Sequence, residues 1–339
     1  MENGNLWDLK ASGALLVNKH QGVSSFGIIE LLQDQLQMQF GIKRKQQPKI
    51  GHGGTIDPFA TGLLVVCVGK AVKLARYFLG GTKRYEGVIF FGETTVPGDP
   101  TAPVSEKSEV IPGSIEEVGK AADKFSKEAY LQKPPMHSAK KKNGKPLYEL
   151  ARAGIEVDRE AKLCHLYSFK INSYQPPRAS FDLICSSGTY VRTLAQDIGK
   201  SLGTVAMLET LTRTQSGAFK LENAWTIEQI ADAGSKQVHW WQLPCWIPFD
   251  RMLDGYRKVS ATSEEAEALC RGQQNVLFNI LKRSSLSEVD SAAVEGQESC
   301  VVVYHGEQLL AVVRRQDQKW ELERVFLPNK SVLEKSAIK

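Results

Sequence analysis

The sequence predicts a mixed α+β fold with a large domain over residues 10–246 and a small β-rich domain over 247–330, followed by a tail, 331–339. Three observations support this division. A chain of 339 residues is long for a single core. The first part mixes helix and strand patterns, and the part after Pro248 consists mainly of short strand-like runs.

The first elements of the large domain are a strand and a helix. Leu15-Leu16-Val17 is a short apolar run that predicts a strand. Ser24 is a typical helix N-cap residue, and the apolar residues after it recur at every fourth position: Ile28, Leu32 and Leu36. The polar and basic segment 41–49 then predicts a loop.

Four further strands and two further helices are predicted in the large domain. The strands are apolar runs or alternate apolar with polar residues, at 63–68, 85–92, 167–171 and 181–185. Segment 94–113, rich in Pro, Gly and charge, predicts a surface connection. Ser114 and Glu117 then form a capping box for a helix to about Phe125. A second helix is predicted from about Tyr190 to Leu202, with Gly203 as its stop signal.

The small domain is predicted from three short strand-like runs, 301–304, 309–313 and 322–327. The first two are joined around His305-Gly306, as in a hairpin. The polar stretch 281–299 contains few aromatic residues and predicts a loose loop inside this domain.

The composition is ordinary for a soluble protein, with 42% hydrophobic and 24% charged residues. The longest apolar runs, such as Gly62 to Val68, are far too short to span a bilayer. The N-terminal residues show neither a signal peptide nor a transit peptide, so we expect a cytoplasmic protein. The six cysteines are scattered without a C-x-x-C pair, which argues against a zinc site or a redox motif.

The positive charge is clustered, although the net charge is only +5. Residues 124–145 hold seven lysines against one glutamate, and Lys43-Arg44-Lys45 with Lys49 forms a second group. Such clusters fit a phosphate-rich partner. Most lysine runs are solvated loops, and charge alone does not decide between the two interpretations.

The segment 51–62, which reads Gly-His-Gly-Gly-Thr-Ile-Asp-Pro-Phe-Ala-Thr-Gly, is the most informative part of the chain. Its four glycines allow close backbone approach and place one carboxylate, Asp57, on an ordered loop. Taken singly, Asp57 before a proline is more often a turn residue, and His52 is more often structural.

As a set, however, this segment resembles the G-H-x-G-x-L-D-P-x-A-x-G motif of the TruB family of pseudouridine synthases, with Ile56 in place of leucine. Other blocks of the family follow in the same order between about residues 13 and 225. They are K-x-Y at 83–85, P-P-x-x-S-A-x-K-x-x-G within 134–154, G-T-Y-I-R-x-L-x-x-D-x-G at 188–199, and L-x-R-x-x-x-G at 211–217.

The resemblance implies a catalytic domain built on a mainly antiparallel sheet flanked by helices and loops, with an RNA-binding insertion at about 94–155. The stretch from about Ile247 to Asn329 weakly resembles the PUA-like domain that follows it in many relatives, with 263–273 as its opening helix. Such domains bind RNA ends or stems, although a small β-barrel that only packs on the catalytic domain is the alternative.

The resemblance also implies roles for individual residues. Asp57 would be the catalytic carboxylate, paired with Arg192, and Tyr85 would stack on the target base. Tyr190 and Leu211 would complete the pocket. The remaining implied positions contact RNA: His52 at the flipped loop nucleotides, and Lys19, Lys140, Lys141, Lys142 and Arg152. Lys19 begins the family's early K-P-x-G block, which stands here as Lys19-His-Gln-Gly22 without its proline.

These roles fit a single reaction. Pseudouridine formation breaks the C1′–N1 bond, turns the uracil and rejoins it through C5, which calls for one ionised carboxylate as nucleophile or base, with no cofactor and no metal. The partner implied is the T arm of tRNA, with uridine-55 as the target and a monomeric enzyme. Two alternatives are a guide-RNA-dependent, dyskerin-type enzyme and a catalytically idle RNA-binding module. The segments 140–154 and 97–127 favour the stand-alone enzyme.

Overall fold

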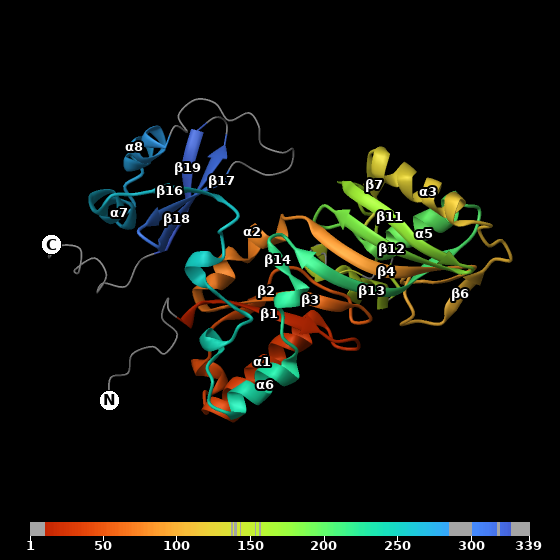
Figure 1. Ribbon diagram of the computed structural model, residues 1–339, viewed down its shortest axis with the longest axis horizontal. Helices are drawn as coiled ribbons and strands as arrows, with labels where there is room; N and C mark the ends of the chain where they lie inside the picture. The colour runs from red at the N-terminus through yellow and green to blue at the C-terminus, as the bar shows by residue number, and fades with distance from the viewer. Residues whose placement is uncertain are drawn as a thin grey trace.

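A computed structural model describes residues 11–136, 138, 141–142, 144–152, 154–155, 157–284, 300–316 and 319–326. Its centre is a nine-stranded sheet whose main path runs β11-β12-β4-β13-β3-β1-β15, with β2 and β14 added at β3 and β13 (Figure 1). Only the β13–β3 pair is parallel, so the predicted mainly antiparallel sheet is confirmed. The strands are β1 (Gly13–Lys19), β2 (Ile50–His52), β3 (Thr61–Val68), β4 (Lys83–Phe91), β11 (Leu166–Gln175), β12 (Arg178–Cys185), β13 (Ala206–Ser216), β14 (Phe219–Lys220) and β15 (Trp246–Pro248).

Helices cover the two ends of this sheet. At one end α1 (Ser25–Phe40) packs on α6 (Ile227–Ser235), and at the other end α3 (Ile115–Lys127) and α5 (Val191–Ser201) pack on β11 and β13 (Figure 1). The predicted N-caps are confirmed, because the Ser24 hydroxyl accepts from the Gly27 N–H and the Ser114 hydroxyl accepts from the Glu117 N–H. Asn, Asp, Ser and Thr fill such positions because they satisfy a free helix N–H.

The remaining elements of the large domain are short. They are η2 (Arg44–Gln46), η3 (Gly69–Leu74), α2 (Ala75–Leu79), β5 (Glu93–Thr95), β6 (Val104–Lys107), β7 (Tyr130–Gln132), β8 (Lys141–Lys142), β9 (Lys145–Pro146), α4 (Leu147–Arg152), β10 (Lys162–Cys164), η4 (Leu221–Asn223), η5 (Trp240–Gln242) and η6 (Phe249–Arg251). Strands β5 and β6 pair with each other, so segment 94–113 contains part of a hairpin that its loop-like composition concealed.

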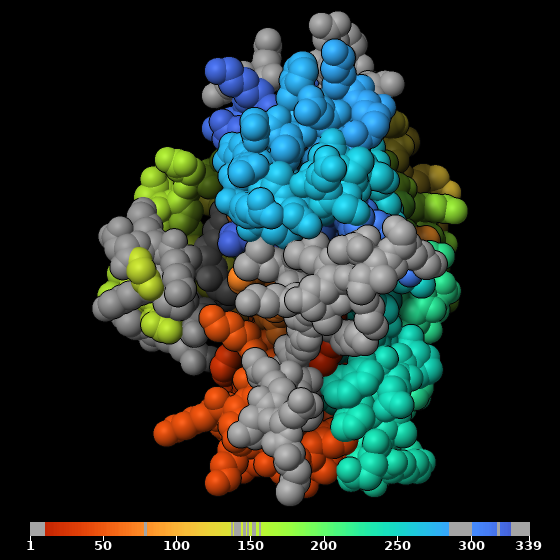
Figure 2. Space-filling model, turned by 90° about the vertical axis from the view of Figure 1, so that its left-hand side faces the viewer, coloured from red at the N-terminus to blue at the C-terminus, as the bar shows by residue number. Residues whose placement is uncertain are grey.

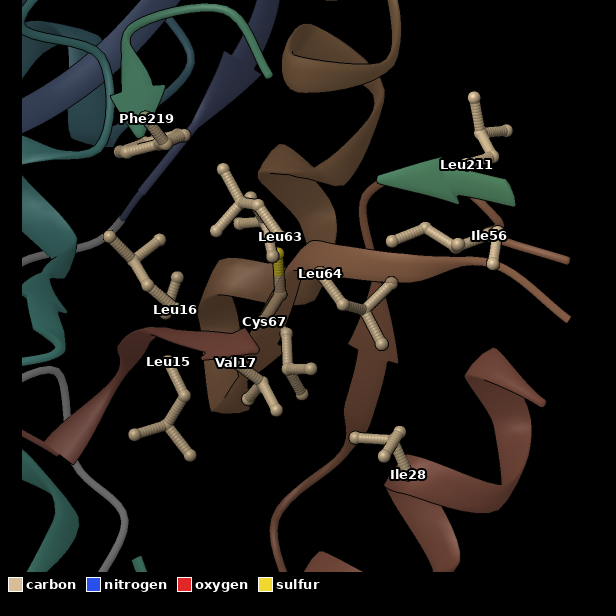
Figure 3. Close-up of a cluster of buried hydrophobic side chains, with 14 of the residues drawn as sticks. Leu15, Leu16, Val17, Ile28, Ile56, Leu63, Leu64, Cys67, Leu211 and Phe219 are labelled. Carbon is tan, nitrogen blue, oxygen red and sulfur yellow. The ribbon is translucent and has the colours of Figure 1, made fainter. Parts of the chain in front are cut away.

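The apolar core is formed by the adjacent strands β1 and β3 together with α1, and it determines where the glycine-rich loop lies. Leu15, Leu16 and Val17 of β1 belong to one buried cluster with Leu63, Leu64 and Cys67 of the neighbouring β3 and with Ile28 of α1 (Figure 3). Ile56, which precedes Asp57, is 4% exposed in the same cluster. Burial of a side chain of this size contributes roughly 2 kcal/mol. The loop is therefore anchored to the core one residue before its carboxylate.

The small domain consists of a four-stranded sheet and two helices. The sheet has the order β16-β17-β18-β19, with β16 (Arg257–Ser260), β17 (Cys300–His305), β18 (Gln308–Gln316) and β19 (Lys319–Val325). The helices are α7 (Ser263–Cys270) and α8 (Val276–Arg283). The three predicted strands and the opening helix are thus confirmed. Residues 281–283 of the predicted loose loop belong to α8, and 285–299 and the tail 331–339 lie outside the described residues.

The small domain packs directly on the large one. The Arg76 guanidinium of α2 pairs with the Glu323 carboxylate of β19 (2.5 Å), and the Tyr256 hydroxyl donates to the Tyr77 carbonyl (2.8 Å). Figure 2 shows the small domain above the segments that contain α1 and residues 225–245. Strand β15 pairs with β1 across the predicted domain boundary at 246/247, so the large sheet extends to Pro248. No helix among the described residues is long and apolar enough to span a bilayer.

Candidate active site

The glycine-rich loop between β2 and β3 is held against β13 by an arginine. Gly62 has a φ of +103°, and a Cβ there would lie 2.4 Å from the Arg213 carbonyl oxygen, so only glycine fits. The buried Arg213 guanidinium donates to three carbonyls of the loop and of β3: Leu63 (2.8 Å), Gly54 (3.0 Å) and Thr55 (3.3 Å). The Arg213 guanidinium therefore satisfies carbonyl groups of the loop and fixes the position of the loop backbone on β13.

Two side chains from the N-terminal segment hold the loop on either side of Asp57. The buried Ser25 hydroxyl accepts from the Ile56 N–H (2.8 Å) and donates to the Ile56 carbonyl (3.0 Å). The Lys19 ammonium donates to the carbonyls of Val23 (2.8 Å), His20 (3.0 Å) and Pro58 (3.4 Å). The residues before and after Asp57 are thus both tied down.

Asp57 forms a bidentate ion pair with Arg192 at the start of α5. Arg192 Nε donates to Asp57 Oδ2 (2.8 Å) and Nη2 donates to Oδ1 (3.0 Å). The other terminal nitrogen, Nη1, donates to Asp99 Oδ2 (3.0 Å) and to the Pro97 carbonyl (2.9 Å). The side chains of Arg192 and Asp99 are 5% and 4% exposed, whereas that of Asp57 is 33% exposed. One arginine therefore joins a buried carboxylate to one that a ligand can reach.

The surroundings of Asp57 act on its charge in opposite directions. Partial burial raises the pKa of the Asp57 carboxyl above its ordinary value, and the charge of Arg192 with its hydrogen bonds opposes this rise. Such a carboxylate is poorly hydrated but still has a fixed counter-ion. That combination is typical of a carboxylate with a chemical role.

The two tyrosines of the predicted pocket lie within electrostatic range of Asp57. Burial raises the pKa of both Tyr85 and Tyr190, and the Asp57 charge acts in the same direction on each. Tyr85 lies on β4 opposite Arg213 of β13. Tyr190 caps α5, where the Gln132 side-chain amide accepts from its N–H (2.7 Å) and donates to its carbonyl (2.9 Å).

His52 and Leu211 lie on strands that border the loop. His52 ends β2, and burial, followed by the charge of Arg213, lowers the pKa of its imidazole, which is therefore neutral at pH 7. Its Nδ1 atom is buried and has no hydrogen-bond partner among the described residues. Leu211 on β13 is 7% exposed and lies near Ile56 (Figure 3).

The predicted RNA-contacting lysines have different outcomes. Lys19 is fully buried and its ammonium is occupied by backbone carbonyls, so the prediction of direct RNA contact is wrong for this residue. Lys19 holds the loop instead. Lys140 lies outside the described residues. Lys141 and Lys142 form β8 and Arg152 ends α4, but their side chains are not among those described.

Sequence reasoning missed Asp99, Ser25, Arg213 and Gln132 as members of this site. Asp99 lies in a stretch rich in proline and charge, and Ser25 directly follows the more obvious helix cap. Arg213 belongs to the L-x-R-x-x-x-G block, but the block by itself indicates no role for this arginine. That block was the one signal that pointed to any of the four.

Comparison with known proteins agrees with this geometry. Residues 41–191 match the model of the TruB family pseudouridylate synthase N-terminal domain, and residues 192–243 match that of the tRNA pseudouridylate synthase B C-terminal domain. The tRNA pseudouridine synthase B of Thiobacillus denitrificans is 42% identical over 228 residues, which is 67% of this chain and 73% of that relative. The chain belongs to the TruB family. It is accordingly a tRNA pseudouridine synthase, an isomerase.

Further members of the TruB family and two solved structures extend the comparison. The Psychrobacter arcticus tRNA pseudouridine synthase B is 35% identical over 284 residues, covering 84% of this chain and 72% of that relative. A Cbf5-Nop10-Gar1 complex contains a chain with a TM-score of 0.67 at 18% identity, covering 96% of this chain and 88% of that one. A chain in the structure of an H/ACA RNP bound to a substrate RNA has a TM-score of 0.64 at 17% identity. The match covers 94% of this chain and 86% of that one. These two structures support the same fold, small domain included.

Loss of the Ser25 hydroxyl is expected to slow turnover in this TruB-family enzyme without weakening tRNA binding. Ser25→Ala leaves a buried N–H and a buried carbonyl of Ile56 unsatisfied, which costs about 1–3 kcal/mol and loosens the loop beside Asp57. We expect kcat to fall about 10-fold or more while the Kd for tRNA stays constant. Ser24→Ala is the matched control, because it removes the α1 cap and so costs about 1 kcal/mol of stability, but it leaves Ile56 held. Equal kcat values for the two variants would refute the positioning role.

The burial of Lys19 is expected to appear in the pH dependence of stability. Burial lowers the pKa of Lys19 to about 8, although Asp57 opposes this and Arg213 adds to it. Between about pH 8 and 10.5 the unfolded chain binds the proton and the folded chain does not, so stability rises with pH in this window. The full effect amounts to roughly 3 kcal/mol. Urea unfolding from pH 7 to 10.5 should show this rise in wild type and a smaller one in Lys19→Met. If the free energy of unfolding changes with pH in the same way in wild type and in Lys19→Met, the lowered pKa is wrongly assigned to Lys19.

Proposed function

We propose that this protein isomerises uridine-55 in the T arm of tRNA to pseudouridine as a stand-alone, monomeric enzyme of the cytoplasm, without a guide RNA. The relatives above carry the name tRNA pseudouridine synthase B, which supports tRNA as the substrate. The observation that carries the proposal is the partly exposed Asp57 carboxylate, which Arg192 holds through a bidentate ion pair.

The reaction requires one well-placed carboxylate. It breaks the bond between C1′ and N1, joins C1′ to C5, transfers the C5 hydrogen to a base and adds a proton to N1. Asp57 acts as nucleophile or base in these steps, since its carboxylate is partly exposed and poorly hydrated. Arg192 keeps it ionised and correctly oriented, because a bidentate guanidinium fixes both carboxylate oxygens.

The target uridine must leave its stack to reach Asp57. A base inside a folded loop is inaccessible, so the enzyme flips it out and must hold the detached uracil while it turns. We assign the contact with the uracil face to Tyr85 and the completion of the pocket to Tyr190 and Leu211. The neutral His52 imidazole contacts the nucleotides that remain in the loop, where a planar ring can stack on a base.

Guide independence is the feature that separates this proposal from its nearest alternative. The two solved structures of similar fold come from a Cbf5-Nop10-Gar1 complex and an H/ACA RNP, so the fold by itself does not separate the stand-alone and guided modes. Matches of 35–42% identity to proteins named tRNA pseudouridine synthase B favour the stand-alone mode.

The decisive experiment measures tritium release from a tRNA transcript labelled at C5 of uridine, with the purified chain and no other RNA. We expect stoichiometric release of one tritium per tRNA, and none from a transcript in which position 55 is cytidine. If wild type releases nothing from the tRNA alone, the stand-alone activity is refuted. Undiminished release from the cytidine-55 transcript refutes the choice of position.

A further inference from the structure

The segment that surrounds the catalytic loop has an unusual charge balance. Between residues 35 and 85 the only acidic residue is Asp57. The same segment contains the basic residues Lys43, Arg44, Lys45, Lys49, Lys70, Lys73, Arg76, Lys83 and Arg84. A stretch with one acidic residue and many basic ones is typical of a surface that meets a polyanion.

Four of these basic side chains already have partners within the protein, so we do not count them among the charges available to a ligand. Arg44 pairs with Asp34, Arg76 with Glu323, and Arg84 with Asp182. Lys83 is 5% exposed and donates to the Gly81 carbonyl. The remaining five are Lys43, Lys45, Lys49, Lys70 and Lys73, which we call the basic surface.

The basic surface has unneutralised charge. Lys43, Lys45, Lys49 and Lys73 are exposed, and Lys70 is half-buried. In the described part of the chain, no ion pair joins any of the five to an acidic side chain. Five solvated ammonium groups without counter-ions can exchange their mobile anions for phosphates.

The backbone brings the two parts of the basic surface together and fixes them. The Lys49 carbonyl accepts from the Gly69 N–H (2.8 Å), next to Lys70, at the point where β2 starts beside β3. Lys70 and Lys73 are three residues apart in η3, so they lie on the same side of this 3-10 helix. The Gln47 amide donates to the carbonyls of Gln33 (2.7 Å) and Ile42 (3.1 Å), which ties the loop to α1. A fixed set of charges binds with a smaller entropic cost than a mobile loop.

The basic surface continues directly into the candidate active site. Lys49 immediately precedes β2, which ends at His52 three residues later, a distance of about 10 Å along a strand. Beyond His52 the chain enters the loop that carries Asp57. Strand β2 belongs to the large sheet, and α2, which follows η3, lies between this sheet and the small domain (Figure 1). An RNA whose flipped base lies at Asp57 can therefore continue over these lysines.

We infer that the basic surface of Lys43, Lys45, Lys49, Lys70 and Lys73 is a second tRNA-docking site, which binds backbone phosphates next to the flipped uridine. The inference rests on the proposed function, because it takes tRNA as the ligand at Asp57. Lysines contact phosphates as point charges without reading sequence, so this surface contributes affinity and register and leaves the chemical step alone.

The test compares two triple variants that remove the same charge. Lys43→Gln/Lys45→Gln/Lys49→Gln changes the basic surface. Lys170→Gln/Lys200→Gln/Lys236→Gln changes exposed lysines on β11, at the end of α5 and directly after α6, outside both the basic surface and the segment 94–155. The Kd for full-length tRNA is measured from 50 to 300 mM KCl, and kcat is measured by tritium release at saturating tRNA.

The first triple variant should bind tRNA about 10- to 100-fold more weakly at 0.1 M salt, with a salt slope reduced by roughly 2 to 3 and kcat unchanged. Restoring charge with Lys43→Arg/Lys45→Arg/Lys49→Arg should restore the affinity. A wild-type Kd and slope in the first triple variant, or an equal loss in the second, overturns the inference. Wild-type turnover in the same assay reports separately on the proposed function.

Discussion

Replacement of Asp57 with asparagine is expected to abolish tritium release from tRNA while tRNA binding is retained. The amide has nearly the shape of the carboxylate and still accepts a hydrogen bond from Arg192, but it is neither a nucleophile nor a base. Loss of the reacting group typically lowers kcat by at least about 1000-fold. Because the basic surface and the remaining pocket are untouched, the Kd for tRNA should stay within a few-fold of wild type.

The matched control for this variant is Asp254→Asn. Asp254 also accepts from cations, Lys258 and Arg251, but it lies on the surface at 40% exposure and away from the loop. Exposed pairs of this kind contribute less than about 1 kcal/mol, so the control should retain full activity and nearly full stability. Turnover by Asp57→Asn within 10-fold of wild type would remove Asp57 from the chemistry and leave only an RNA-binding role.

The elements that sequence predicted well are those with strong periodic patterns. The apolar runs of β1 and β3 and the fourfold spacing on α1 are local signals, since each comes from burying one face of one element. The family blocks predict that Asp57 pairs with Arg192, although the two residues lie 135 positions apart in the sequence. Spacing alone would not have paired them.

The parts that escaped prediction depend on contacts between distant segments. The buried Asp99 carboxylate is paired with Arg192, which reaches it from α5, and nothing in the sequence around Asp99 indicates this partner. Lys19 ends a strand whose side chains are almost all buried, and a lysine there gives no sign of being buried too. Strand β13 is not predicted, because all of its residues after Leu211 are polar, from Thr212 to Ser216, so that part shows neither an apolar run nor alternation although Arg213 is buried.

Replacement of Arg192 with lysine is expected to cause the second large loss, in kcat more than in folding. Lysine keeps one positive charge but lacks the planar fork that reaches Asp57 Oδ1, Asp57 Oδ2, Asp99 and the Pro97 carbonyl at once. The shorter ammonium is expected to remain with the buried Asp99, whose carboxylate has less access to water, and to leave Asp57 free to rotate. We expect kcat to fall about 100-fold or more, with little change in the Kd for tRNA.

Arg178→Lys provides the comparison that separates buried from exposed arginine chemistry. Arg178 makes an equally bidentate pair with Glu209, but the two side chains are 53% and 28% exposed. The same substitution there should change stability by less than about 1 kcal/mol and leave kcat unaltered. If Arg192→Lys keeps wild-type kcat while its melting temperature falls, Arg192 supports the fold only. A drop in kcat in a variant that melts like wild type would show that the fork itself positions the carboxylate.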